Sequence, residues 1–481
     1  MSHAATDPLL PRLARLGSFL RRFPDWLFAP TRKPAHWLVL GVILSASLAL
    51  QWKLGQGFAS QANQDMNASD QLAYLRLVER NMPAPWPAII DGTRNPLFPW
   101  LLKPWYSPDR AQLFATAKTV SIIFGMIASA VLGCYFLLRL PLLPAVVLTL
   151  LGTYAVILPV STVVGAEVVF YVAFFFLWVC FWRMLTTDRL LTYAAGGFIC
   201  ALAYLAKPST QLLTLVFFLL SLAALRQGFS SDKLRRLLLA SGVFLGCFLL
   251  PVLPRAWSAW QQYGDPFQSC SAYCFWTENW DEAHPRLGYY SRRRIAELPE
   301  SQRPSMTHYW QHHTYAQMLG RLGDGVPVQA WNFFLPEKTL KLNRKPAKMT
   351  RLLIGARGAY PVALLCLTMS LALTARSAPE ERDERCSRRA LWWLSGLAFA
   401  VHFLAFAFYT PVSPGARFIM ATYLPMLFAL AIGIESLRNL KPRQWREGLY
   451  RITYLAMAIV LFSQILPLLQ ARVFGEVRGA F

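Results

Sequence analysis

The sequence predicts an all-α polytopic membrane protein, with about 11 transmembrane helices and two extracytoplasmic loop regions that form a cap. The first observation is composition, because 55% of the 481 residues are hydrophobic and only 15% are charged. A soluble protein carries about 25% charged residues, so soluble enzymes, disordered chains, collagens and coiled coils are excluded. The second observation is that the charges cluster between long apolar runs. The third is a net charge of +23, which in a membrane protein is typical of basic cytoplasmic loops.

The apolar runs are long enough for transmembrane helices, each of which needs about 20 mostly apolar residues. Prolines such as Pro141, Pro208 and Pro251 are predicted to mark helix ends, because proline interrupts a helix. The predicted spans are 35–52, 113–138, 142–161, 164–182, 190–206, 210–225, 237–253, 352–374, 390–409, 416–434 and 452–470.

The basic clusters predict the orientation, because short loops rich in Arg and Lys stay in the cytoplasm. With a cytoplasmic N-terminus, every short basic cluster falls on the cytoplasmic side. These clusters include Arg183 and Arg189, Arg235 and Arg236, Arg388 and Arg389, and Arg443 and Arg446. The remaining two long segments then lie outside, so we expect an integral plasma membrane protein with its functional site on the extracytoplasmic side.

Four regions follow from this topology. Residues 1–34 are a cytoplasmic basic and amphipathic lead, with aromatic residues among the arginines as in a helix lying on the membrane surface. Residues 35–253 are a transmembrane core with a first outer loop at 53–112, residues 254–350 an extracytoplasmic loop domain, and residues 351–481 the C-terminal transmembrane helices. The outer segments are rich in Trp, Tyr and Pro, which favours a folded cap over a solvated linker.

The first outer loop carries two candidate acids, Asp65 and Asp70. Leu72, Leu75 and Val78 recur at helical spacing after them, so Asp70 is predicted at a helix start, with the apolar stripe lying on the membrane. A carboxylate at that interface is placed to act as a general base on an acceptor hydroxyl. The alternative is that both acids only cap a surface helix.

Three further charged residues stand at the outer ends of apolar runs: Glu167, Lys207 and Arg417. Placing an ionisable side chain at such a position costs free energy, so these residues are functional candidates. Lys207 and Arg417 break the positive-inside pattern, and two cations at the outer mouth suit a phosphate or pyrophosphate group. The alternatives are an exposed interfacial residue for Glu167 and snorkelling for Lys207.

The long outer loop offers weaker signals. Its aromatic residues, among them Trp276, Trp280, Tyr289 and Tyr290, suit either carbohydrate stacking or an aromatic belt at the headgroups. His308 and His312 could share a metal if their segment is helical. No nucleotide-binding loop or hydrolase elbow is present, so nucleotide hydrolysis has no support.

Several of these motifs, taken together and in order, resemble the GT-C glycosyltransferases, specifically the group of protein O-mannosyltransferases and aminoarabinose transferases. The segment from Asp70 to Tyr74 resembles the acidic motif of the family's first outer loop, and Arg94 to Pro99 its Arg/Pro segment. The segments 161–167, 203–208, 263–267 and 417–418 then follow in the family's order. This sequence departs from the family at Gln71, where a second acid commonly follows the first.

The resemblance implies inverting transfer of a sugar from a polyprenyl-phosphate donor to an extracytoplasmic lipid, glycan or protein acceptor. Asp70, with Asp65 as a possible second acid, would be the base, and the donor phosphate would bind Lys207, Arg417 and Arg94. Glu167 and Tyr74 would position the acceptor. No cofactor is required, but a divalent cation, Mg²⁺ or Mn²⁺, held by Asp70 and Glu167 stays open. Membrane lipids are expected partners and nucleic acid is not. The alternatives are a transporter or flippase of an anionic lipid-linked glycan, and an enzyme similar to O-antigen ligases or polymerases.

Overall fold

The structure is a computed structural model of the chain. It describes residues 27–28, 33–60, 64–67, 69–86, 94–226, 231–284, 299, 304–334, 382–413, 415–437, 450–455 and 457–459. Within these ranges every regular element is a helix. Most of the basic N-terminal lead, the predicted span 352–374, most of the span 452–470, and Tyr289 and Tyr290 lie outside the described residues.

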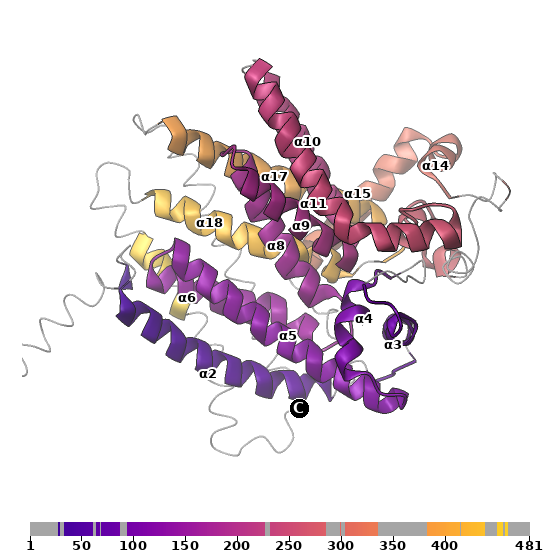
Figure 1. Cartoon of the computed structure of the whole chain (residues 1–481), viewed down its shortest axis with the longest axis horizontal. Helices are drawn as coiled ribbons and strands as arrows, with labels where there is room; N and C mark the ends of the chain where they lie inside the picture. The colour runs from indigo at the N-terminus through magenta and orange to yellow at the C-terminus, as the bar shows by residue number, and fades with distance from the viewer. Residues whose placement is uncertain are drawn as a thin grey trace, which may run out of the picture.

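The helices run largely alongside one another, as Figure 1 shows for α2, α5 and α18, and the short helices α3, α4 and α14 gather at one end. That end is called the α3 end below. The α-helices are α2 (Pro34–Ala59), α3 (Ser69–Asn81), α4 (Leu97–Leu102), α5 (Arg110–Arg139), α6 (Leu142–Leu151), α7 (Leu158–Ser161), α8 (Glu167–Met184), α9 (Leu190–Ala206), α10 (Thr210–Arg226), α11 (Ser231–Tyr263), α12 (Cys270–Cys274), α14 (Met306–His312), α15 (Tyr315–Phe334), α17 (Arg382–Tyr409) and α18 (Tyr423–Leu437). A π-helix, η2 (Gly152–Ile157), joins α6 to α7, and the 3-10 turns are η1 (Lys103–Trp105), η5 (Ala416–Phe418) and η6 (Met420–Thr422).

Six stretches of the described chain are long and apolar enough to cross a membrane: Pro34–Ala59, Arg110–Arg139, Leu142–Ser161, Glu167–Met184, Leu234–Tyr263 and Arg389–Tyr409. Three shorter apolar helices accompany them, at Leu190–Ala206, Thr210–Ala223 and Met420–Glu435. Each coincides with a predicted span. The prediction of an all-α, multi-pass membrane protein is therefore confirmed for the part of the chain that the structure describes.

The apolar stripe of α3 does not face lipid, so this part of the prediction is wrong. Leu75 and Val78 of this stripe are 0% exposed and belong to the main apolar core, and the neighbouring Leu77 is also 0% exposed. The stripe packs on protein because α4 and α5 lie against α3. Burial of three aliphatic side chains, at about 1.5–3 kcal/mol each, fixes the helix and with it the direction of Asp70.

Helix α11 is longer than predicted and does not end at Pro251. It continues through Pro251 and Pro254 to Tyr263. Proline interrupts a membrane helix less sharply where neighbouring helices pack closely against it. Here α9 lies so close that a Cβ on Gly197 would be 2.2 Å from the Phe244 carbonyl oxygen of α11. Helix α11 thus continues ten residues beyond the predicted boundary at residue 253, from 253 to 263.

Helix α15 lies in the predicted outer loop domain, yet it packs along the membrane helix α17. The Phe333 ring lies 5.1 Å from Phe399 and 4.3 Å from Tyr423, centroid to centroid, within the main core. Nearer the α3 end, a Cβ on Gly325 would stand 1.8 Å from the Ala407 carbonyl oxygen. Only glycine permits this approach of the two backbones.

Gly325→Ala is therefore expected to lower the thermal stability of the purified protein in detergent, because α15 must move away from α17. Overpacking of this kind costs about 1–3 kcal/mol. Gly323→Ala on the same helix is the matched control, since nothing lies within 4 Å of the Cβ it would add. Alanine favours helix over glycine by about 0.5–1 kcal/mol, so the control should be neutral or stabilising. Equal melting temperatures for the two variants would contradict the close packing.

Candidate active site

Asp70 lies in the first turn of α3, where the helix dipole favours a negative charge. Its two carboxylate oxygens contact two different arginines. Arg94 donates to Oδ1, and Arg417 Nη1 donates to Oδ2 at 2.5 Å. Arg94 precedes α4 and Arg417 belongs to η5, so three separate segments meet at one carboxylate. The Tyr171 hydroxyl of α8 fixes η5 in turn, by donating to the Arg417 carbonyl oxygen at 2.6 Å.

Glu167 and Lys207 form a second ion pair beside the first. Lys207 Nζ donates to Glu167 Oε1 at 2.7 Å, and the two side chains are 17% and 12% exposed. Arg417 Nη1 lies 4.0 Å from the same Glu167 oxygen, which joins the two pairs into one cluster. Gly165 makes room for this arrangement, because a Cβ there would be 2.3 Å from Glu167 Oε2.

The cluster consists of Asp70, Glu167, Arg94, Lys207 and Arg417, and is called the ion cluster below. Three cations face two carboxylates, which leaves one excess positive charge. All five residues stand at helix ends or in connecting turns at the α3 end. The sequence named all five as candidates, and the structure brings them together.

Burial and charge act in opposite directions on Asp70. Burial by itself raises the pKa of its carboxyl group, but Arg94 and Arg417 together outweigh it and hold that pKa well below its usual range. Asp70 is therefore a carboxylate at any physiological pH. Burial raises the pKa of the Tyr74 hydroxyl, and the negative charge of Glu167 adds to this effect, so Tyr74 stays protonated.

Tyr74 lines the cluster, and Asp65 does not. The Tyr74 ring lies 5.8 Å from the Arg94 guanidinium carbon and meets Phe98 edge-on. Asp65 is exposed, and its Oδ1 accepts from the backbone N–H of Asn67 in the loop before α3. Of the two candidate acids, Asp70 is thus the one in contact with the cations.

A residue that sequence reasoning missed is Arg255 of α11, which is only 1% exposed. Its guanidinium donates to the Pro266 and Gln268 carbonyl oxygens at 2.7 and 2.6 Å and reaches Asn95 Oδ1 at 3.4 Å. Asn95 donates in turn to the Tyr204 carbonyl oxygen. This network ties the segment that carries Arg94 to the end of α9 that precedes Lys207. The signal in the sequence was an arginine just beyond the outer end of the predicted span 237–253, a position like that of Lys207 after the span 190–206.

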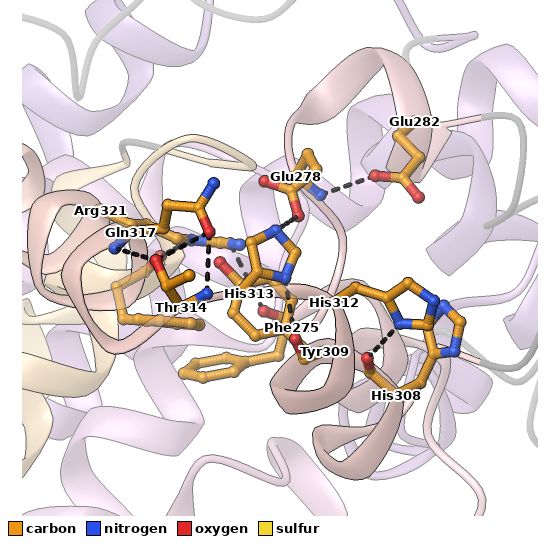
Figure 2. Close-up of polar contacts among 11 residues, drawn as sticks. Phe275, Glu278, Glu282, His308, Tyr309, His312, His313, Thr314, Gln317 and Arg321 are labelled. Atoms are coloured by element: carbon orange, nitrogen blue, oxygen red, sulfur yellow. Dashed lines mark hydrogen bonds and ion pairs between the residues drawn. The ribbon is translucent and has the colours of Figure 1, made fainter.

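Figure 2 shows the contacts that join α14 and α15 to the segment after α12. His313 Nε2 lies 2.8 Å from Glu278 Oε1, and its Nδ1 lies 2.8 Å from the Tyr309 carbonyl oxygen. His313 thereby links Glu278 to the backbone of α14. Arg321 of α15 donates to the Phe408 carbonyl oxygen at 2.8 Å and so attaches this group to the end of α17 that leads to η5.

The ion cluster does not fit a divalent cation. Both oxygens of Asp70 accept from arginines, and Glu167 Oε1 accepts from Lys207, so the oxygens a metal would need already face positive charge. Among the described residues, no three or more His, Cys, Asp and Glu side chains are grouped to hold a metal. His308 and His312 do lie on one helix, with their rings 4.1 Å apart, but no third ligand joins them within the described ranges.

Comparisons with known proteins give matches among solved structures alone. Two of these are crystal structures of ArnT from Cupriavidus metallidurans, one bound to undecaprenyl phosphate and one in the apo state. The first is 12% identical, with a TM-score of 0.30 over 82% of this chain and 78% of that chain. The second is 12% identical, with a TM-score of 0.29 over 81% of this chain and 77% of that chain.

No protein-family model and no curated protein sequence matches the chain. At TM-scores of 0.30 and 0.29 the likeness carries no argument, so the functional conclusion depends on the residues of the ion cluster.

Proposed function

We propose that the protein is a membrane glycosyltransferase that moves a sugar from a polyprenyl-phosphate donor to an extracytoplasmic lipid, glycan or protein acceptor, with inversion at the anomeric carbon. The observation that carries the proposal is the ion cluster itself. Three cations and two carboxylates meet beside the ends of the apolar helices α8 and α9, with one positive charge in excess. Such a site suits an anionic group attached to a lipid chain, because the chain can stay in the membrane while its phosphate reaches the cations.

Lys207, Arg417 and Arg94 are the proposed phosphate ligands. They would also stabilise the charge that develops on the phosphate as it leaves, which is where electrostatic catalysis has its largest effect. Arginine suits this role because its planar fork matches two phosphate oxygens. A polyprenyl phosphate is itself a competent leaving group, so no metal step is included.

Asp70 is the proposed general base, and Asp65 is not, because Asp65 points into its own loop. The acceptor hydroxyl oxygen attacks the anomeric carbon from the face opposite the phosphate. The bond between that carbon and the phosphate oxygen breaks, and the electron pair leaves with the phosphate. The hydroxyl proton passes to Asp70. Glu167 and Tyr74, which border the same cluster, would position the acceptor. We place the reaction at the periplasmic face of the inner membrane, in line with the distribution of basic loops.

The test is transfer from a radiolabelled polyprenyl-phosphate sugar in membranes that contain the wild type or Arg417→Gln. Loss of one hydrogen bond to a charged group costs about 1.5–3 kcal/mol, so we expect the KM for the donor to rise about 10–100-fold. Arg110→Gln is the control, since Arg110 forms an exposed pair with Glu79. We expect EDTA to have no effect.

An unchanged donor KM in Arg417→Gln would contradict the proposed phosphate site. A donor that crosses the membrane with its sugar still attached, at the same rate in both proteins, would identify a transporter instead.

A further inference from the structure

The starting point is that an internal carboxylate already occupies the two arginines. Each oxygen of Asp70 accepts from a different guanidinium, from Arg94 on one side and Arg417 on the other. The third cation, Lys207, is likewise satisfied by Glu167. Hence each cation of the cluster has a carboxylate partner before any ligand arrives.

A carboxylate and a phosphate compete for arginine because both present paired oxygens to the same planar fork. A phosphodiester such as the proposed donor carries one negative charge, as Asp70 does. Exchange of one for the other leaves the charge opposite the two arginines balanced. The Asp70 side chain is 31% exposed and that of Arg417 is 40% exposed, so the pair is open to an incoming anion.

We propose that Asp70 is the resident counter-ion of the phosphate site, and that the phosphate of a prenyl-phosphate ligand displaces it from Arg94 and Arg417. This inference rests on the proposed function and adds an order of events to it, in which the donor binds before Asp70 can act as the base. Before displacement, Asp70 holds both arginines in place and cannot serve as a base, because both of its oxygens are occupied. After displacement, its oxygens are free to accept a hydroxyl proton. The base becomes available only when the donor is bound.

Two features of the structure favour exchange over a permanent structural pair. Arg417 belongs to the short 3-10 turn η5 between α17 and α18, so its side chain can change partner without unwinding a membrane helix. Glu167 Oε1 lies 4.0 Å from Arg417 Nη1 and provides a second carboxylate that keeps Arg417 near the site during the exchange.

The inference predicts that removing the Asp70 charge strengthens anion binding. The probes are farnesyl phosphate and inorganic phosphate, titrated by calorimetry against the purified full-length protein in detergent. Asp70→Asn should bind farnesyl phosphate at least about tenfold more tightly than the wild type, which corresponds to about 1.4 kcal/mol. Arg417→Gln should bind it at least about tenfold more weakly.

Glu79→Gln is the matched control, because it removes the same charge from the same helix at an exposed pair with Arg110. It should bind like the wild type. If Glu79→Gln gained as much affinity for farnesyl phosphate as Asp70→Asn, the loss of one negative charge anywhere on the helix would explain the effect. That result would overturn the inference. If farnesyl phosphate binds more tightly than inorganic phosphate, the ligand is the phosphate of a lipid. If the two bind equally, the site takes free phosphate, and the proposal of a prenyl-phosphate ligand is overturned.

A second measurement uses the wild type and so does not depend on the folding of a variant. Carbodiimide modification of the peptide that contains Asp70, followed by mass spectrometry, should increase when farnesyl phosphate is added. If Asp70→Asn binds no more tightly and the labelling is unchanged, the exchange is wrong while the proposed transferase stands. If the wild type binds neither probe and Arg417→Gln changes nothing, the proposed phosphate site itself fails.

Discussion

Asp70→Asn is expected to abolish most glycosyl transfer while leaving a folded protein. General base catalysis contributes about 10²–10⁴-fold, and kcat should fall by that factor with labelled donor and saturating acceptor. Asparagine keeps the size of aspartate and an oxygen that can accept from arginine, but it cannot take a proton. Donor binding should not weaken, and by the exchange inferred above it should become tighter, so the loss is expected in kcat.

Asp65→Asn is the control for this experiment. It changes the same residue type five positions earlier, in a side chain that is exposed and bonded within its own loop. We expect it to retain nearly full transfer activity. If Asp65→Asn lost activity and Asp70→Asn kept it, the assignment of the base would have to be reversed. Full activity in both variants would remove the aspartate base from the mechanism.

Glu167→Gln is expected to destabilise the folded protein by about 3–5 kcal/mol, because it leaves a largely buried lysine charge without its partner. The Lys207 and Glu167 side chains are only 17% and 12% exposed, and their contact is 2.7 Å. Thermal and denaturant unfolding in detergent measure the effect. The double variant Glu167→Gln with Lys207→Gln should recover most of the loss, since it removes both charges together.

The exposed pair of Glu79 and Arg110 provides the comparison, with side chains 34% and 41% exposed. Exposed pairs contribute about 0–1 kcal/mol, so Glu79→Gln should barely change stability. A double variant at Glu167 and Lys207 that is as unstable as the sum of its single variants would show that the two charges do not compensate each other.

The helices of this chain could be predicted well because apolar length is a local property. The first predicted span, 35–52, became the core of α2, and the others that lie within the described residues also became helices. The end of α11 was predicted too early, because Pro251 and Pro254 lie inside the helix and do not end it. Hydropathy also could not show that α3 packs on protein, because this depends on its contacts with α4 and α5.

The members of the ion cluster were predictable one at a time, since a charge at the outer end of an apolar run is visible in the sequence. Their pairing was not. Asp70 and Arg417 are 347 positions apart, and nothing local indicates that they meet. Arg255 was missed because its partners are mostly backbone carbonyls, which leave no trace in residue type.

The positions of the paired residues along the chain also determine when the site is completed during synthesis. Arg94 follows Asp70 by 24 positions, and Lys207 follows Glu167 by 40, so each early carboxylate receives a cation soon after it leaves the ribosome. Arg417 arrives last and contacts both carboxylates. A nascent chain that has inserted α2 to α11 thus already contains both carboxylates, Arg94 and Lys207, but not Arg417. The ion cluster can close only once η5 has been synthesised, so the centre we assign to catalysis is completed after α2 to α11 and α17.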